Sequence, residues 1–387
     1  MRIAFNGLFL ENPGNGSGQY AYHLLEALGR VDGINEYVIL TPHEVRDKPD
    51  TSSSFTWQTA PVGQLGRGGA SLEKLIWEQH TFPMAAKREN ARVMHVPYFA
   101  PPLLGHGVPR VVSIRDVIGL RLPAYRASPA AAAYNQLVAR AAKQANMVIT
   151  ISEFSKRDIM EVLGIPEDRI RVVLLAPAPR FKRIVDASRL REARERYGFA
   201  ERFVLYVGGL DQRKNVSTLV GAFAGVYHAI GDPGLQLVIS GDPGKLGSSQ
   251  MFPDWRPLAE TLGIADHIRC TYVAQDDLPL IYSATSCFVF PSLYEGFGLT
   301  PLEAMACGAP VVCSERTSLP EVVGRAGILV NPEDPDALSG AIQRVLTSPG
   351  LREDLRARAQ AHVKRYTWTQ AAVDTSAVYA DVMGTRV

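Results

Sequence analysis

Between residues 287 and 303 the chain reads Cys-Phe-Val-Phe-Pro-Ser-Leu-Tyr-Glu-Gly-Phe-Gly-Leu-Thr-Pro-Leu-Glu, an apolar run followed by a glycine turn that leads into a helix. Thr300 can act as the N-cap of that helix, Pro301 suits its first position, and Glu303 falls at the third position of a capping box. Backbone N–H groups of the first turn would point into the space beside Glu295. The stretch therefore predicts an anion site next to a carboxylate, which suits a phosphate joined to a group that bears hydroxyls.

Short apolar runs and amphipathic runs alternate along the chain on both sides of this stretch. The expected strands lie at 2–6, 37–41, 93–97, 110–114, 147–151 and 170–174, and then at 203–207, 235–240, 268–273, 287–290, 310–313 and 328–330. The expected helices lie at 18–30, 72–87, 129–144 and 153–163, and then at 215–230, 255–262, 278–284, 301–307 and 335–347. This alternation predicts an α/β protein with two successive parallel sheets, each covered by helices on both faces.

The chain is long enough for two domains, since its 387 residues, 46% of them hydrophobic, exceed the size at which one core stops growing. The segment Ala176-Pro-Ala-Pro179 is kept extended by its prolines and reads as a linker. We expect domains at 1–177 and 178–365, with a helix over 366–387 that packs back on the first domain because it has no core of its own. Residues 50–69 are polar and glycine-rich, and we expect a loop there.

Composition excludes several classes of protein. The net charge is +2, which gives no argument for a nucleic-acid partner, and the four cysteines have the spacing of neither a zinc ribbon nor a redox pair. No apolar run approaches the ~18 residues that span a bilayer, so we expect a soluble or peripheral cytoplasmic protein with buried, reduced thiols.

One part of the first domain is basic. Residues 64–145 hold eleven Lys and Arg, including Arg67 and Arg126, against four Asp and Glu, and Trp77 and Phe82 lie among them. Such an excess suits an anionic membrane face or a diphosphate-lipid acceptor. Ordinary solvated helix faces are the alternative interpretation.

Two cations precede the first helix of the second domain. Arg213 and Lys214 follow a strand and a glycine turn, and they come directly before the helix expected at 215–230. Two fixed cations and the positive end of a helix would be directed at one position, where they suit a phosphate. A pair of this kind can also be a solvated surface feature.

The first domain carries its own glycine loop, Gly14-Asn-Gly-Ser-Gly18, at the start of the helix expected at 18–30. Such a loop admits phosphate oxygens closely, and a plain flexible loop is the alternative. Gly16, Gly18 and Ala21 also match a dinucleotide fingerprint, but the glycines lie too far beyond the first strand and no acid closes the second strand. Because the match is poor in these two respects, an oxidoreductase is disfavoured. His95 and the pair Arg115-Asp116 end two other strands, where ligands of doubly wound sheets bind.

Several of these motifs together resemble one family, the retaining glycosyltransferases of family 4, which have the GT-B fold. The resemblance covers nearly the whole chain. It rests on the turn with Arg213-Lys214-Asn215, the run Val289 to Leu299, the pair Glu295 and Glu303 with seven residues between them, and Leu319-Pro-Glu-Val-Val-Gly324. It implies two Rossmann-like domains that face a cleft and hold a nucleotide-diphosphosugar there, mostly through the second domain.

The resemblance also implies roles for individual residues. The catalytic group would be Arg213 and Lys214 on the diphosphate, where they offset leaving-group charge, and Glu295 beside the sugar ring. Further contacts to the donor are expected from Glu303 at the ribose, Val273 near the base, the backbone of Gly298, Leu299 and Thr300, and the loop residues Gly16, Ser17 and Gly18. Acceptor contacts are expected from His95, Arg115 and Asp116.

The implied activity is transfer of a hexose, with retention, to a glycan or a polyprenyl-diphosphate-linked glycan in polysaccharide biosynthesis. GDP-mannose is the first candidate donor, because Arg-Lys-Asn at 213–215 and Ser-Leu-Pro-Glu-Val at 318–322 most resemble the mannosyl- and rhamnosyltransferase subgroup. The resemblance implies no nucleophile, and we expect no metal and no cofactor, since His80, His106 and His362 lack ligand spacing.

Three departures from the family pattern stand in this chain: Arg115 replaces a common histidine, Gly209 replaces a common arginine, and a glycine is missing before Tyr272-Val273. Two rival functions stay open, and the departures at Arg115 and Gly209 favour the second of them. One is a GT-B epimerase or hydrolase that acts on the nucleotide sugar alone. The other is a non-catalytic protein that only binds it.

Overall fold

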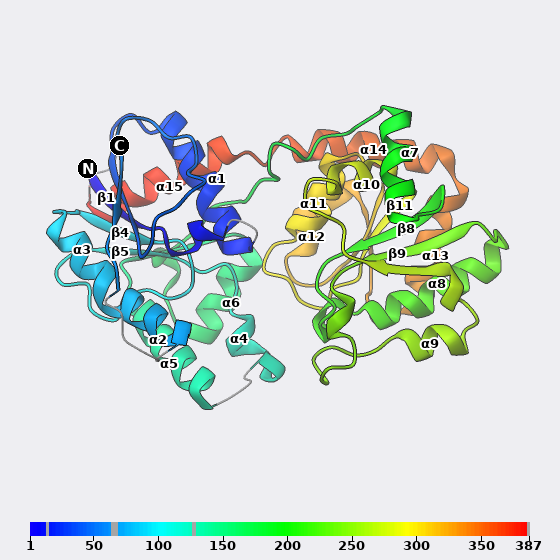
Figure 1. Cartoon of the computed structure of the whole chain (residues 1–387), viewed down its shortest axis with the longest axis horizontal. Helices are drawn as coiled ribbons and strands as arrows, with labels where there is room; N and C mark the ends of the chain where they lie inside the picture. Colours follow the sequence, from blue (N-terminus) through cyan, green and yellow to red (C-terminus); the bar gives the residue numbers. More distant parts are fainter. Residues whose placement is uncertain (13–14, 63–68, 126–128, 385–387) are drawn as a thin grey trace. The chain divides into compact units, whose positions relative to one another are not determined.

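The computed structural model describes residues 1–12, 15–62, 69–125 and 129–384, and it divides the chain into two compact units. The first unit comprises Met1–Leu175 and Thr367–Val387, and the second comprises Ala176–Tyr366 (Figure 1). Each unit contains one parallel β-sheet with helices on both faces. The α/β class and the two doubly wound sheets that the alternating pattern predicts are therefore confirmed.

The sheet of the first unit has seven parallel strands in the order β3-β2-β1-β4-β5-β6-β7. Its strands are β1 (Arg2–Asn6), β2 (Glu36–Thr41), β3 (Phe55–Thr59), β4 (Val93–Val96), β5 (Arg110–Ser113), β6 (Met147–Thr150) and β7 (Ile170–Val172). The central strands β4 and β6 are buried at every position. That burial is typical of a parallel sheet covered on both faces, and it explains why the sequence reads as continuous apolar runs there.

Helices of the first unit follow the strands in alternation. They are α1 (Gly16–Val31), α2 (Gly69–Ile76), α3 (Phe82–Arg88), α4 (Ile118–Arg121), α5 (Pro129–Lys143), α6 (Glu153–Leu163) and α15 (Trp368–Val382), with short turns η1 (Leu8–Glu11), η2 (Trp77–Thr81), η3 (Pro123–Tyr125) and η4 (Glu167–Arg169). The single helix expected at 72–87 is interrupted by η2, which is a π-helical turn. Trp77 and Glu78 of this turn are buried. An apolar period of 3.6 does not reveal such a change of register.

The expectation of a loop over 50–69 is wrong for its middle part. β3 occupies Phe55–Thr59 at the edge of the sheet, where only Phe55 is buried. The Phe55 ring stacks on Tyr37 with centroids 4.4 Å apart. The remaining strand residues are mostly exposed and polar, so the segment lacks the apolar run by which an inner strand is recognised. Residues 63–68 of the expected loop lie outside the described part of the chain.

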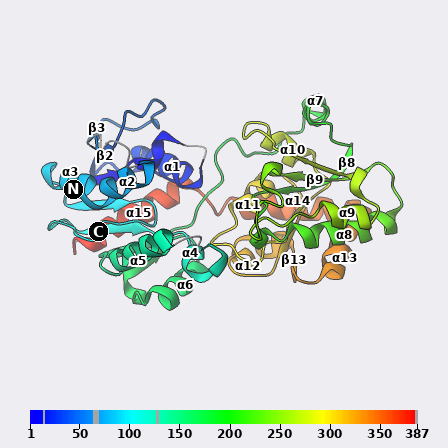
Figure 2. The same cartoon turned by 60° about the horizontal axis from the view of Figure 1, so that its bottom comes forward.

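The terminal helix α15 packs along α1 within the first unit, and Figures 1 and 2 show the two helices side by side from different directions. Tyr379 of α15 is fully buried, and its hydroxyl lies 2.7 Å from Nδ1 of His95 on β4. Ser376 donates a hydrogen bond of 2.8 Å to the buried Asp32 carboxylate beyond α1. Helix α15 is thus part of the first unit's core.

The second unit has six parallel strands in the order β10-β9-β8-β11-β12-β13. They are β8 (Arg202–Val207), β9 (Leu235–Ser240), β10 (Ile268–Thr271), β11 (Cys287–Phe290), β12 (Val311–Ser314) and β13 (Ile328–Val330). The helices are α7 (Ala187–Tyr197), α8 (Val216–Ile230), α9 (Arg256–Thr261), α10 (Leu278–Ala284), α11 (Leu299–Ala306), α12 (Leu319–Val323), α13 (Pro335–Thr347) and α14 (Pro349–Val363), with turns η5 (Gln212–Lys214), η6 (Pro243–Lys245), η7 (Ala265–His267) and η8 (Gly324–Ala326). α7 has no counterpart among the predicted helices, because it buries only Ala193 and its sequence has no apolar stripe.

Candidate functional site

The glycine turn after β11 differs in detail from the prediction. Helix α11 begins at Leu299, and Gly298 is its N-cap with a φ of 114°. Thr300 and Glu303 are therefore the second and fifth residues of the helix, and the predicted capping box is wrong. The reason is that Gly298 turns the chain into the helix two residues early, in a conformation that favours glycine. A Cβ at this position would meet Leu319 Cδ2 at 2.7 Å.

Within the described residues, no side chain caps the start of α11. The first N–H groups of a helix have no partner in their own helix. They lie at the carboxyl end of β11, where doubly wound sheets bind ligands. The expected anion site at this turn thus keeps its backbone donors although the predicted cap is absent.

The cation turn of the second unit is fixed by Asn215. This residue follows η5 in the left-handed conformation, with a φ of 58°. Its side-chain amide donates to the carbonyl oxygens of Pro291, at 3.3 Å, and Pro332, at 2.7 Å. The backbone N–H of Leu293 donates to the carbonyl of Arg213 at 2.8 Å. The turn after β8 is therefore tied to the loop after β11, which carries Glu295.

These ties bring together the two cations and the carboxylate that the sequence singled out. Lys214 Nζ lies 2.5 Å, and Arg213 Nη1 lies 2.9 Å, from Oε1 of Glu295. Ser292 donates a hydrogen bond of 2.8 Å to the same oxygen. The exposed fractions of the Arg213, Lys214 and Glu295 side chains are 14, 11 and 13%. The three side chains form a compact, poorly solvated ionic cluster.

Two further groups complete the electrostatics of this cluster. Asp211 Oδ1 lies 3.4 Å from Arg213 Nε, and Lys214 Nζ lies 4.8 Å from the centre of the Phe290 ring. Burial alone would raise the pKa of Glu295, but Lys214, Arg213 and the Ser292 hydrogen bond outweigh that effect and lower the pKa. Glu295 is therefore ionised at neutral pH, and the cluster holds two cations and two carboxylates.

The loop backbone around Glu295 is positioned by two hydroxyl groups for which the sequence predicted no role. Thr317 Oγ1 accepts the Glu295 N–H at 3.0 Å, and Ser318 donates to the carbonyls of Glu295, at 2.9 Å, and Phe297, at 2.7 Å. Ser318 is fully buried. Its position directly before the motif Leu319 to Gly324 was the available signal for this role.

Glu303 has a different environment from Glu295. Its side chain is partly exposed on α11, and burial raises its pKa to about 8, with a smaller opposing effect from Arg180. Among the described contacts none joins Glu303 to Arg213 or Lys214. The carboxyl group is therefore largely protonated at neutral pH, and it can donate as well as accept a hydrogen bond at a sugar hydroxyl.

Val273, expected near the base, is buried, and its N–H donates to Ser240 Oγ at 3.2 Å. The Val273 side chain thus packs in the core, and its contact with the base stays a prediction. The adjacent Tyr272 is 61% exposed.

In the first unit, the predicted phosphate loop lies against Arg115. Helix α1 starts at Gly16, and Asn15 Oδ1 accepts the N–H groups of Ser17 and Gly18 at 3.0 and 2.8 Å. Arg115 donates to the Gly16 carbonyl and to Ser17 Oγ, each at 2.5 Å. The loop and the strand-end arginine are thus joined by two hydrogen bonds, and two of the loop's backbone donors are already used by the Asn15 cap. Gly14 lies outside the described residues.

His95 lies in the core of the first unit. It is fully buried, and its Nδ1 and Nε2 atoms lie 2.7 Å from Tyr379 Oη and 2.9 Å from Ser113 Oγ. Burial lowers its pKa to about 3, so the ring is neutral. These contacts give His95 a structural role in the core, and its contact with an acceptor stays a prediction. Asp116 is partly exposed, and its Oδ1 accepts the N–H of Ile118 at 3.1 Å.

The basic segment of the first unit also differs from its predicted surface. Trp77 and Phe82 are fully buried and cannot enter a membrane from this conformation. Lys87, Arg88 and Arg92 are exposed. Arg67 and Arg126 lie outside the described residues.

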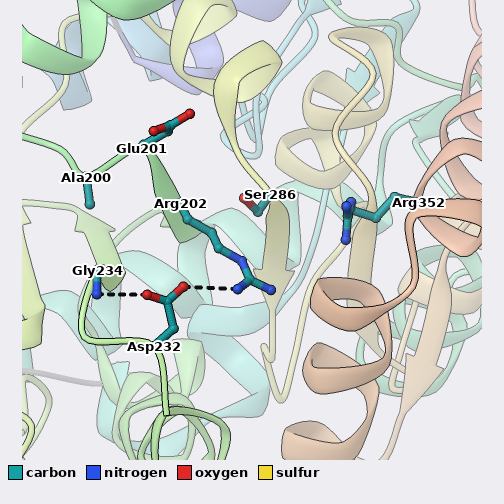
Figure 3. Close-up of a pocket in the computed structure, with 7 residues that line it drawn as sticks. All are labelled: Ala200, Glu201, Arg202, Asp232, Gly234, Ser286 and Arg352. Atoms are coloured by element: carbon teal, nitrogen blue, oxygen red, sulfur yellow. Dashed lines mark hydrogen bonds and ion pairs between the residues drawn. The ribbon is translucent and has the colours of Figure 1, made fainter. Parts of the chain in front are cut away.

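A pocket of about 590 Å³ in the second unit includes Arg202, Asp232 and Arg352 (Figure 3). It lies at the amino ends of β8, β9 and β11, opposite to the edge where such sheets bind ligands. Arg202 pairs with Asp232 at 3.0 Å and donates to the carbonyl of Leu346, and Arg352 donates to the same carbonyl and to that of Val345. Both arginines therefore satisfy the last carbonyls of α13, and the pocket is not part of the candidate site.

Two properties of the described residues bear on the kind of site. They contain no group of three or more His, Cys, Asp and Glu side chains arranged to hold a metal ion. No helix in the same part of the chain combines the length and the apolar character that a membrane crossing needs.

Comparison with known proteins identifies two domain families along the chain. Residues 14–174 match the family model described as Glycosyltransferase Family 4, and residues 191–362 match that of Glycosyl transferases group 1. The chain is 33% identical to O-antigen chain mannosyltransferase B of Escherichia coli, over 98% of this chain and 99% of the relative.

Solved structures show the same fold. The sucrose-phosphate synthase of Thermosynechococcus elongatus superposes with a TM-score of 0.73 and 22% identity, over 99% of each chain. The HepE protein of Anabaena in complex with UDP-glucose gives a TM-score of 0.72 at 16% identity, over 98% of this chain and 100% of the other. Both proteins are similar to this chain over its whole length.

Proposed function

The chain belongs to the glycosyltransferases, with a family 4 domain followed by a group 1 domain in the GT-B fold, and on this premise we propose that it transfers a hexose from a nucleotide sugar to a glycan acceptor. The observation that carries this proposal is the contact of Glu295 with both Arg213 and Lys214. Nucleotide sugars present a diphosphate next to a ring of hydroxyls, and this cluster offers cations for the former and a carboxylate for the latter.

The proposed division of labour follows the two units. The second unit binds the donor through the ionic cluster and the start of α11, and Glu303 contacts the ribose. The first unit binds the acceptor. In the transition state, negative charge builds up on the diphosphate, and fixed cations in a poorly solvated cluster stabilise that charge without reorganisation.

We propose retention of configuration by attack on the front face of the sugar. The bond between the anomeric carbon and the diphosphate oxygen breaks, and a bond to the acceptor hydroxyl oxygen forms on the same face. The acceptor proton passes to the departing diphosphate oxygen, so the products are a glycoside and a nucleoside diphosphate. No side chain acts as a nucleophile in this scheme, and no metal ion or cofactor takes part. Activity that survives EDTA and an NMR spectrum that shows the donor's anomeric configuration in the product would support the scheme.

Mannose from GDP-mannose is the proposed donor, in the assembly of a polysaccharide such as an O-antigen. The mannosyltransferase from Escherichia coli, similar over nearly the full length of both chains, supports the sugar. The HepE protein, which has the same fold, was solved in complex with UDP-glucose. That complex does not indicate which base this chain binds. A thermal-shift panel of GDP-, UDP- and dTDP-sugars tests the donor. We expect the largest rise in melting temperature with GDP-mannose, and no rise with any member of the panel would overturn the proposal.

The same protein preparation separates transfer from the rival activities. Incubation of the best donor without acceptor should leave the nucleotide sugar intact over a time in which transfer is complete. Rapid hydrolysis or epimerisation without an acceptor would instead identify an enzyme that acts on the nucleotide sugar alone. Binding without any turnover, across a panel of glycan acceptors, would identify a binding protein.

We also propose that the protein works at the cytoplasmic face of a membrane, on a polyprenyl-diphosphate-linked glycan. The exposed basic residues Lys87, Arg88 and Arg92 support this location. Sedimentation with anionic vesicles should decrease as salt is raised, and sedimentation that does not respond to salt would contradict an electrostatic attachment.

A further inference from the structure

A pocket in the first unit contains none of the residues expected to bind the donor or the acceptor, although Lys74 and Trp77 belong to the basic segment 64–145. Its volume is about 350 Å³, and its lining includes Leu8, Glu11, His43, Glu73, Lys74 and Trp77. Leu8 and Glu11 follow β1, and His43 follows β2. The pocket therefore lies at the carboxyl ends of parallel strands, the edge at which doubly wound sheets bind ligands.

The ammonium group of Lys74 is held at the wall of this pocket by three neighbours. Its Nζ lies 5.1 Å from the ring centre of Tyr134 and 5.8 Å from that of Phe9. It lies 3.6 Å from Oε1 of Glu78, and the Lys74 side chain is still 39% exposed. Aromatic faces and a carboxylate stabilise an ammonium in place, so Lys74 presents a fixed donor rather than a freely moving one.

Glu78 is the unusual member of this arrangement. It is fully buried on the π-helical turn η2, and Tyr134 donates a hydrogen bond of 2.8 Å to its Oε2. Within the described part of the chain its Oε1 receives no hydrogen bond. A buried carboxylate with an unsatisfied oxygen costs free energy, and π-helical turns of this kind are frequent at functional sites. Its only ion pair in the structure's described part is with Lys74, which lines the pocket.

The charges and the apolar side chains of the lining indicate which class of ligand the pocket can bind. Glu11 and Glu73 stand exposed at its rim, and the Glu78 carboxyl lies behind Lys74. Acidic groups thus outnumber the single ammonium, an arrangement that repels a phosphate. Leu8, Pro42, Val62 and Trp77 supply an apolar surface, and His43 completes the lining. Carboxylates that accept, an ammonium that donates and an apolar surface together suit the hydroxyls and ring of a sugar.

We propose that this pocket binds one uncharged sugar residue of the acceptor glycan, whose hydroxyls donate to Glu11 and Glu73 and accept from Lys74. The proposal rests on the proposed function, because it names the substrate class of the same transferase. In a lipid-linked acceptor, the pocket would bind the glycan end and not the diphosphate end, because its acidic groups repel a phosphate. Glu78 is a positioning residue, which acts through Lys74.

The first test measures binding of simple probes by saturation-transfer NMR: methyl α-D-mannopyranoside as the uncharged sugar, and mannose 1-phosphate and inorganic phosphate as anions. We expect the methyl glycoside to bind and the two anions not to displace it. Glu73→Gln and Lys74→Met should each weaken glycoside binding at least tenfold. Glu36→Gln is the matched control, because Glu36 is exposed at the amino end of β2 and should leave binding unchanged.

The second test keeps this inference separate from the proposed function. Each variant is examined in the nucleotide-sugar thermal-shift panel, where Glu73→Gln and Lys74→Met should give the same rise in melting temperature as the wild type. Equal glycoside affinity in these variants and in Glu36→Gln, or displacement of the glycoside by phosphate, overturns the pocket assignment. Loss of the nucleotide-sugar shift in the wild type overturns the transferase proposal instead, since the glycoside measurement needs no donor.

Discussion

Glu295 and Lys214 are joined at 2.5 Å in a place where both side chains are almost withdrawn from solvent, although 81 residues separate them in sequence. Arg213 reaches the same oxygen of Glu295 at 2.9 Å. The cations that would bind a diphosphate are thus partnered by the carboxylate that would bind the sugar. A ligand that carries both groups can replace the contact, because its phosphates would pair with Arg213 and Lys214 while its hydroxyls donate hydrogen bonds to Glu295.

The first prediction concerns Lys214→Ala. Removal of one fixed cation from a poorly solvated site should lower turnover by about 10²- to 10³-fold, the usual effect of losing one group that stabilises transition-state charge. Stability should fall much less, because Arg213 still neutralises Glu295. Steady-state kinetics and urea unfolding of the same preparation compare the two effects.

A matched control for this variant is Arg316→Ala. Arg316 forms an exposed ion pair with Glu333 in the same unit, with side chains 48 and 63% exposed. Exposed pairs of this kind contribute little, so both turnover and stability should stay near those of the wild type. Losses of similar free energy in turnover and in unfolding for Lys214→Ala would refute the assigned role.

Ser318→Ala tests whether the loop geometry matters to the site. The substitution leaves the carbonyl oxygens of Glu295 and Phe297 without their hydrogen-bond donor, at a cost of about 1–3 kcal/mol. The hydroxyl touches no reacting atom, so its loss can affect the reaction only by displacing Glu295. We therefore expect a lower kcat. The melting shift with nucleotide sugar should also shrink. An unchanged kcat, measured alongside reduced stability, would leave Ser318 with a purely structural role.

Gly298→Ala is expected to destabilise the protein by about 1–3 kcal/mol, because the native φ is 114° and the new Cβ would meet Leu319. Gly340→Ala is the contrasting variant. Gly340 lies within α13, and a Cβ added there would meet no neighbouring atom within 4 Å, so alanine should stabilise the helix by up to about 1 kcal/mol. Urea midpoints of the two variants should move in opposite directions, and a shift in the same direction would show that strain at Gly298 is not what fixes the turn.

The sequence predicts the order and type of nearly all inner elements, because buried parallel strands and amphipathic helices leave strong apolar patterns. β3 and α7 leave weak ones, since β3 is mostly exposed and α7 buries a single alanine. The convergence of Arg213, Lys214 and Glu295 follows from turns at the same edge of one sheet. The cap at Gly298, the buried position of His95 and the pairing of Lys74 with Glu78 depend on tertiary contacts that no local pattern contains.

The last prediction follows from the raised pKa of Glu303, which is about 8 in the folded protein against an ordinary value of 4.5. Between these two pH values the folded state holds a proton that the unfolded state has released. The contribution of Glu303 to stability is therefore fully present below about pH 4.5 and is lost as the pH rises through 8. Glu303→Gln removes this dependence, so its melting temperature should rise relative to the wild type between pH 5 and roughly pH 8.5. Taking the difference between the two proteins at each pH cancels the contributions of the titratable groups that they share. A difference that stays constant over this range would show that Glu303 is already ionised at neutral pH, and that it meets the ribose only as an acceptor of hydrogen bonds.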